Sequence, residues 1–194
     1  VSTLITPNVL SITSYFCDTL ILSDINIGAM MELDFSCPVV TIECGGSSDD
    51  QAHEVAYQGI KNFAQCDSHC ALPQDKAVQI LYKPLRLVIK TGRKLSFSEH
   101  DEGYSGVTLR KNIEQFNYGG CCDGLLLGWL DDKGLDNFEM LNDQGVNVVA
   151  QYFKMLDNKL VCATSLKIFM ASNQTDIARS DCLFYVVNNV NNHL

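Results

Sequence analysis

The sequence contains no apolar run that approaches the roughly 20 residues needed to cross a bilayer. It also does not open with a basic stretch followed by a cleavable apolar segment. We therefore expect neither membrane insertion nor secretion. Basic residues are few and scattered, with 14 lysines and arginines against 23 acidic residues and a net charge of −9. Because no basic patch is visible, we expect no nucleic-acid partner.

Several catalytic motifs are missing as well. The chain has no glycine-rich phosphate loop and no G-x-S-x-G nucleophile elbow. His53-Glu54 begins like the metal-binding helix of a zinc peptidase, but Tyr57 stands where the second histidine would fall. The paired ligands on one helical face are therefore absent, and His53 is most simply a polar residue of a helix.

Nine cysteines are present, and an odd number without a secretory signal favours reduced thiols in a cytoplasm. Residues 66–70, Cys-Asp-Ser-His-Cys, are ligand types at close spacing, but a structural zinc site needs four ligands. The remaining candidates, Cys121 and Cys122, are adjacent and poorly spaced to chelate one ion together. We favour a plain helix end with thiols over a metal site.

The first part of the chain alternates predicted strands and helices. The clearest signal is a capping box formed by Ser48 and Gln51, followed by apolar residues at helical spacing from Ala52 to Ala64. This helix of about four turns should pack on a sheet. The elements expected before it are strands at 1–5, 19–22 and 37–44 and short helices at 9–16 and 28–33.

From about Gln74 onward the pattern changes to short apolar runs separated by turn signals. The turn signals are typical of hairpins and occur at residues 91–92, 131–134, 142–145 and 157–158. They predict a small, mostly β domain, a barrel or a sandwich. The predicted fold class is therefore α/β followed by mostly β, with domains at 1–74 and 75–194 and a boundary near 72–75.

The stretch at residues 37–46, Cys-Pro-Val-Val-Thr-Ile-Glu-Cys-Gly-Gly, is the best candidate for a site. Its β-branched run without polar alternation predicts a strand buried on both faces of a mixed or parallel sheet. Glu43 ends this strand, where ligand sites of open α/β sheets lie. A carboxylate there loses hydration and should be paired, hydrogen-bonded or shifted in pKa. Both a catalytic acid and a structural acid tied to a helix or loop fit this position.

Four arginines could bind a substrate carboxylate in a bidentate pair: Arg86, Arg93, Arg110 and Arg179. We favour a solvated surface charge for each. The turn-rich segments 101–106 and 135–138 combine acidic, amide or aromatic groups, and we favour hairpin closure over function for both.

The stretch at 37–46, together with the helix that begins Asp-Gln-Ala-His-Glu-Val-Ala, resembles the succinylglutamate desuccinylase/aspartoacylase family. These zinc hydrolases are relatives of the M14 zinc carboxypeptidases. The resemblance is strongest over residues 20–63. Residues 134–138 and 179–187 resemble the C-terminal β domain of bacterial members. The resemblance implies a partial zinc-peptidase-like α/β domain followed by a β domain.

The resemblance also implies an activity, the hydrolysis of an amide bond in a small N-acyl amino acid or at the carboxy terminus of a peptide. Glu43 matches the family's general base, which takes a proton from zinc-bound water. Nothing in the chain matches the family's zinc ligands, which are expected upstream of Val1, so the chain would be the C-terminal portion of the enzyme. We expect it to be inactive and free of catalytic zinc when alone, and copies to associate through uncovered surface. The alternative is a non-catalytic β-rich binding or assembly module with a degenerate hydrolase remnant.

Overall fold

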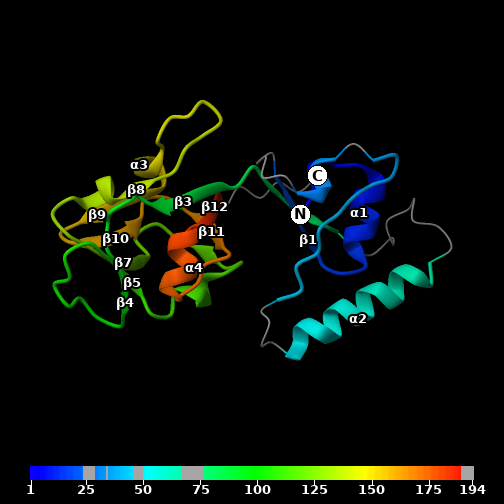
Figure 1. Cartoon of the computed structure of the whole chain (residues 1–194), viewed down its shortest axis with the longest axis horizontal. Helices are drawn as coiled ribbons and strands as arrows, with labels where there is room; N and C mark the ends of the chain where they lie inside the picture. Colours follow the sequence, from blue (N-terminus) through cyan, green and yellow to red (C-terminus); the bar gives the residue numbers. More distant parts are fainter. Residues whose placement is uncertain (24–28, 34, 46–49, 67–76, 189–194) are drawn as a thin grey trace. The chain divides into compact units, whose positions relative to one another are not determined.

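The computed structural model describes residues 1–23, 29–33, 35–45, 50–66 and 77–188 (Figure 1). The chain is a mixed α/β protein that is mostly β, with several open sheets. It forms two compact units that divide after Pro84. No helix in the described part is long and apolar enough to cross a membrane.

The first unit contains a small parallel sheet. Strands β1 and β2 pair in register from Thr19 opposite Gln79 to Leu22 opposite Tyr82. On the other side of β1, the Ser2 amide donates a hydrogen bond to the Ile21 carbonyl at 2.9 Å. The elements of this unit are α1 (Pro7–Ser14), β1 (Thr19–Leu22), the 3-10 helix η1 (Met30–Glu32), α2 (Asp50–Ala64) and β2 (Gln79–Tyr82).

Helix α1 confirms the helix predicted after Pro7. Thr6 caps it, because its hydroxyl accepts a hydrogen bond from the Val9 amide at 3.2 Å, and proline suits the first helical position. The buried side of α1 is unusually polar. Thr13 and Ser14 are satisfied locally, since their hydroxyls donate to backbone carbonyls of the same helix at 2.8 and 2.7 Å.

Helix α2 is also present as predicted, although Ser48 of the proposed capping box lies outside the described residues. Its packing differs from the expectation. Gly59 is its one buried position, and a Cβ there would lie 2.1 Å from the Phe16 ring, so the glycine permits close approach. Val55 and Ile60 are 40% and 61% exposed, so part of the apolar face is left uncovered.

The predicted buried strand at residues 37–44 is not a strand in the structure. The segment is irregular, its side chains are half-buried or exposed, and it is tied to the first residues of the chain. The Thr41 amide donates to the Val1 carbonyl at 3.0 Å, and the Val1 amino group donates to the Thr41 carbonyl at 2.7 Å. β-branched residues favour extended backbone, but a buried strand also needs neighbours on both edges and cover on both faces, which the described residues do not supply.

The second unit consists of two five-stranded sheets that share one apolar core. The sheets have the strand orders β4-β5-β7-β10-β9 and β6-β11-β12-β3-β8, and both contribute side chains such as Leu109 and Phe184 to that core. Neither sheet closes into a barrel. The strands are β3 (Leu85–Ile89), β4 (Leu95–Ser98), β5 (Val107–Arg110), β6 (Gly120–Cys121), β7 (Leu126–Leu130), β8 (Phe138–Glu139), β9 (Phe153–Leu156), β10 (Lys159–Cys162), β11 (Leu166–Phe169) and β12 (Phe184–Asn188).

Four short helices connect these strands. They are η2 (Ile113–Phe116), η3 (Gly134–Asn137), α3 (Val149–Tyr152) and α4 (Thr175–Ser180). Helix α3 includes part of the apolar run at 146–151, which the sequence pattern assigned to a strand. The run was too short for its periodicity to distinguish a helix from a strand.

The predicted turns are present, but not all of them close hairpins. Asp157-Asn158 joins β9 to β10, which pair as an antiparallel hairpin, and Asp157 has the positive φ of 55° typical of such a turn. By contrast, the turn at 91–92 joins β3 to β4, and these strands lie in different sheets. A local turn signal specifies a reversal of the chain and not the sheet that the next strand joins.

The predicted domain boundary at 72–75 lies outside the described residues. Strand β2, which the sequence pattern grouped with the second domain, pairs with β1 in the first unit. The first unit therefore extends to Pro84 instead of ending at residue 74.

Asn117 anchors the loop before β6 to the end of β11. Its side chain accepts a hydrogen bond from the Ala171 amide at 2.8 Å and donates one to the Ala171 carbonyl at 3.0 Å. Replacing Asn117 by alanine should leave these half-buried backbone groups unpaired and lower the free energy of unfolding by about 1–3 kcal/mol. Urea denaturation would measure this. Asn112→Ala is the control. The half-buried Asn112 side chain donates to the exposed side chain of Gln115 at 3.1 Å, so its loss should change stability by about 0.5 kcal/mol or less.

Candidate functional site

Glu43 lies near the end of the irregular segment that is tied to the start of the chain. Two further contacts hold this segment: the Ser2 hydroxyl donates to the Val39 carbonyl at 3.5 Å, and the Thr41 hydroxyl contacts the Met31 sulfur at 3.7 Å. Gly45 follows with a φ of 132°, a conformation that glycine adopts without strain. The backbone around Glu43 is thus fixed at Val39 and Thr41.

The Glu43 side chain is exposed, which differs from the desolvated carboxylate that the sequence pattern predicted. It makes no hydrogen bond or ion pair with the described residues. Its charge acts on the Val1 amino group, whose pKa is lowered by burial while the charges of Cys17 and Glu43 oppose that shift. The difference follows from the missing strand, because a carboxylate at the tip of an uncovered segment keeps its water. Such a group can accept a proton or take a partner.

A hollow of about 420 Å³ lies beside the same segment. Cys37, Pro38 and Val39 form part of its wall, and Glu43 does not line it. The other lining residues, five of them apolar, four with hydroxyl groups and one an acid, are Ser2, Thr3, Leu4, Thr6, Val9, Met31, Glu32, Leu33, Phe35 and Ser36. The hollow can hold apolar groups. The candidate acid, Glu43, comes four residues after Val39, the last residue that lines it.

The described residues do not form a metal site. No group of three or more His, Cys, Asp or Glu side chains among them is placed to hold an ion. Cys66 instead accepts a hydrogen bond from the Tyr15 hydroxyl at 2.7 Å, and residues 67–70 of the candidate motif lie outside the described residues. His53 is an exposed residue in the first turns of α2. The described side chains therefore include no ligand set for the zinc that the family resemblance implies.

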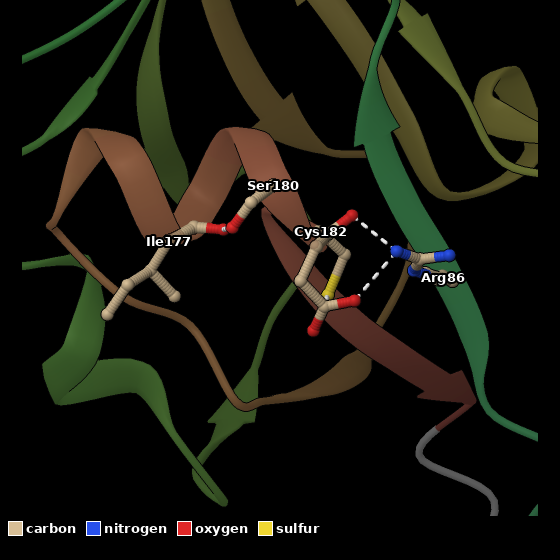
Figure 2. A network of polar contacts seen from close by, with 5 residues as sticks. Arg86, Ile177, Ser180 and Cys182 are labelled. Carbon is tan, nitrogen blue, oxygen red and sulfur yellow. Dashed lines mark hydrogen bonds and ion pairs between the residues drawn. The ribbon is translucent and has the colours of Figure 1, made fainter. Parts of the chain in front are cut away.

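Three of the four arginines make structural contacts in the second unit. Figure 2 shows Arg86 of β3 reaching the loop between α4 and β12, where its guanidinium donates to the Asp181 carboxylate at 2.7 Å. Arg179 donates to the Arg93 carbonyl at 3.3 Å, and the guanidinium of Arg110 lies 5.8 Å from the centre of the Phe116 ring. Arg86 in particular is already paired with a carboxylate and is not free to bind a substrate.

Cys182 is part of the network around Arg86. Burial raises the pKa of its thiol to about 12, with a further contribution from the Asp181 charge and an opposing one from Arg86. This cysteine is 4% exposed and stays protonated at neutral pH. The network therefore joins α4, β3 and β12 and contributes structure, not a reactive thiol.

The two turn-rich segments also have structural roles. Asp131 accepts a hydrogen bond at 2.8 Å from the side chain of Asn137, which is fully buried at the end of η3. Asp101 accepts a hydrogen bond from the Gly103 amide at 2.9 Å and another from the Asn158 side chain. Neither segment closes a hairpin, however, because 101–106 joins the parallel strands β4 and β5, and 135–138 leads from β7 to β8 in the other sheet.

The chain was compared with family models, with curated proteins and with solved structures, and no match was found. The likeness of residues 20–63 to the succinylglutamate desuccinylase/aspartoacylase family remains a prediction from the sequence pattern.

Proposed function

We propose that this chain contributes the general base, Glu43, to a metal-dependent hydrolase that cleaves amide bonds. The substrate would be a small N-acyl amino acid or the carboxy-terminal residue of a peptide. The sequence Pro-Val-Val-Thr-Ile-Glu-Cys-Gly-Gly supports this proposal through its family resemblance. The structural observation that carries it is the Glu43 carboxylate, which is exposed, engages no described side chain and lies two positions before Gly45 with its positive φ of 132°.

In this role Glu43 takes a proton from the attacking water and passes it to the leaving amine as the amide bond breaks. A bound zinc would supply polarisation of the scissile carbonyl and of the water. The proposal requires that the metal ligands come from outside the described residues. Cleavage then needs no covalent nucleophile, in agreement with the missing nucleophile elbow.

The test uses the protein expressed from its full reading frame. Release of free amino acid from a panel of N-acyl amino acids and short peptides would be measured before and after treatment with a chelator. We expect turnover that the chelator abolishes and that added zinc restores, because the water loses its activation without the metal. Absence of turnover on the whole panel, or turnover that survives complete metal removal, would contradict the proposal.

A second candidate is a non-catalytic β-rich module for binding or assembly, in which Glu43 is a remnant. The observation that favours it is the self-contained core of the second unit, to which both sheets contribute. The exposure of Glu43 is also compatible with it. The same assay separates the two candidates, because this module would leave every substrate intact whether or not zinc is added.

A further inference from the structure

Two cysteines of the second unit lie where the chain crosses from one sheet to the other. One crossing leads from β6 to β7 and follows Cys121, and the other leads from β10 to β11 and follows Cys162. Backbone hydrogen bonds join the two crossings: the Gly124 amide donates to the Cys162 carbonyl at 2.9 Å, and the Cys162 amide donates to the Leu125 carbonyl at 3.0 Å. Cys121 also stands opposite Leu166, the first residue of β11. Both cysteines thus belong to one corner of the unit.

The two side chains are enclosed together in the core. Cys121 is 1% and Cys162 0% exposed, and both are free thiols. Each is the strongest influence on the other: hydrogen bonding between the two thiols lowers the pKa of Cys121, against the opposing effect of burial, and raises that of Cys162. The interaction thus stabilises the thiolate of Cys121, and a thiolate is the form that reacts with oxidants.

We infer that Cys121 and Cys162 form an oxidisable dithiol, a modification site that a peroxide converts into a disulfide between the two sheets. The Cys121 thiolate attacks one oxygen of the peroxide, the O–O bond breaks, and a sulfenic acid and water result once the hydroxide takes up a proton. The Cys162 sulfur then attacks the Cys121 sulfur. The S–O bond breaks, the S–S bond forms, and a second water leaves. The two sulfurs lose two electrons, which the peroxide gains.

Neighbouring cysteines fit this reaction less well. Cys122 is exposed, but the Cα atoms of adjacent residues are only about 3.8 Å apart, below the usual spacing of about 4.4–6.8 Å for a disulfide. Cys182 is also buried but has Asp181 and Arg86 as neighbours instead of a second thiol. It is therefore an internal control for a buried cysteine that should not form a disulfide.

The first experiment uses the unaltered chain. The folded protein is exposed to hydrogen peroxide, denatured, alkylated and digested, and its peptides are analysed by mass spectrometry. We expect the peptides of Cys121 and Cys162 to be joined and to separate after treatment with dithiothreitol, while Cys182 carries the alkyl label. Alkyl label on both Cys121 and Cys162 in the oxidised protein, or a bond of either one to Cys122, would overturn the inference.

The second experiment measures thermal unfolding with and without peroxide. A disulfide that closes the loop from Cys121 to Cys162 restricts the unfolded chain, so oxidation should raise Tm by roughly 5–15 °C. Cys122→Ser should keep both the cross-link and the increase in Tm, and Cys162→Ser should lose both. If Cys162→Ser still showed the increase in Tm on oxidation, the inference would be wrong. If that variant does not fold, the peptide map of the unaltered chain decides whether the disulfide forms.

Discussion

Replacing Glu43 by glutamine is expected to lower kcat for amide hydrolysis by about 100- to 10,000-fold in the protein expressed from its full reading frame. Glutamine has nearly the same shape but cannot take up the proton of the attacking water. Because the interaction is needed in the transition state and not for substrate binding, KM should change little. Steady-state kinetics on the best substrate of the panel would measure both constants.

The change should not affect folding, which makes the kinetic result interpretable. The Glu43 side chain is exposed and unpaired in the described part of the chain, so Glu43→Gln should change the free energy of unfolding by about 0.5 kcal/mol or less. Glu54→Gln is a suitable control, since Glu54 is an exposed acid on α2 whose only described contact is a hydrogen bond from Gln58 at 2.8 Å. Equal turnover in the wild type and the Glu43 variant would remove Glu43 from the mechanism.

The sequence predicted those elements whose signal is local. Helix α2 has an apolar face at helical spacing, and the turn at Asp157-Asn158 has residues that tolerate a positive φ. Both are present. The pairing of strands was not predicted, because the register and partner of a strand depend on residues far away in the chain. For this reason the turn at 91–92 was assigned to a hairpin although β3 and β4 belong to different sheets.

The candidate site illustrates the same limit. The β-branched run before Glu43 indicates extended backbone, but burial of that run depends on neighbours that the run itself does not contain. The Cys121–Cys162 contact was not recognised either, because cysteines 41 positions apart carry no local sign that they meet. Arg86 and Asp181 are likewise 95 positions apart and meet only in the fold. Long-range contacts of this kind need the structure or many related sequences.

Gly128→Ala is expected to destabilise the second unit severely. Gly128 lies on β7 opposite Leu109 of β5, and a Cβ there would be 2.1 Å from the Thr108 carbonyl oxygen and 2.8 Å from the Leu109 Cα. These are backbone atoms of a central strand, so they cannot rotate away as a side chain can. The strands β5 and β7 would have to separate, and Leu109, which is fully buried, would lose its packing.

We expect this substitution to lower the free energy of unfolding by about 3 kcal/mol or more, a large part of the typical stability of a domain. Thermal unfolding followed by circular dichroism would measure the loss. Gly119→Ala is the matched control, because a Cβ at Gly119 would meet its nearest atom, the Phe116 carbonyl oxygen, at an ordinary contact distance of 3.4 Å. If both variants unfolded at the wild-type temperature, β5 and β7 could not be as closely spaced as described, and the shared core built on these two strands would have to be arranged differently.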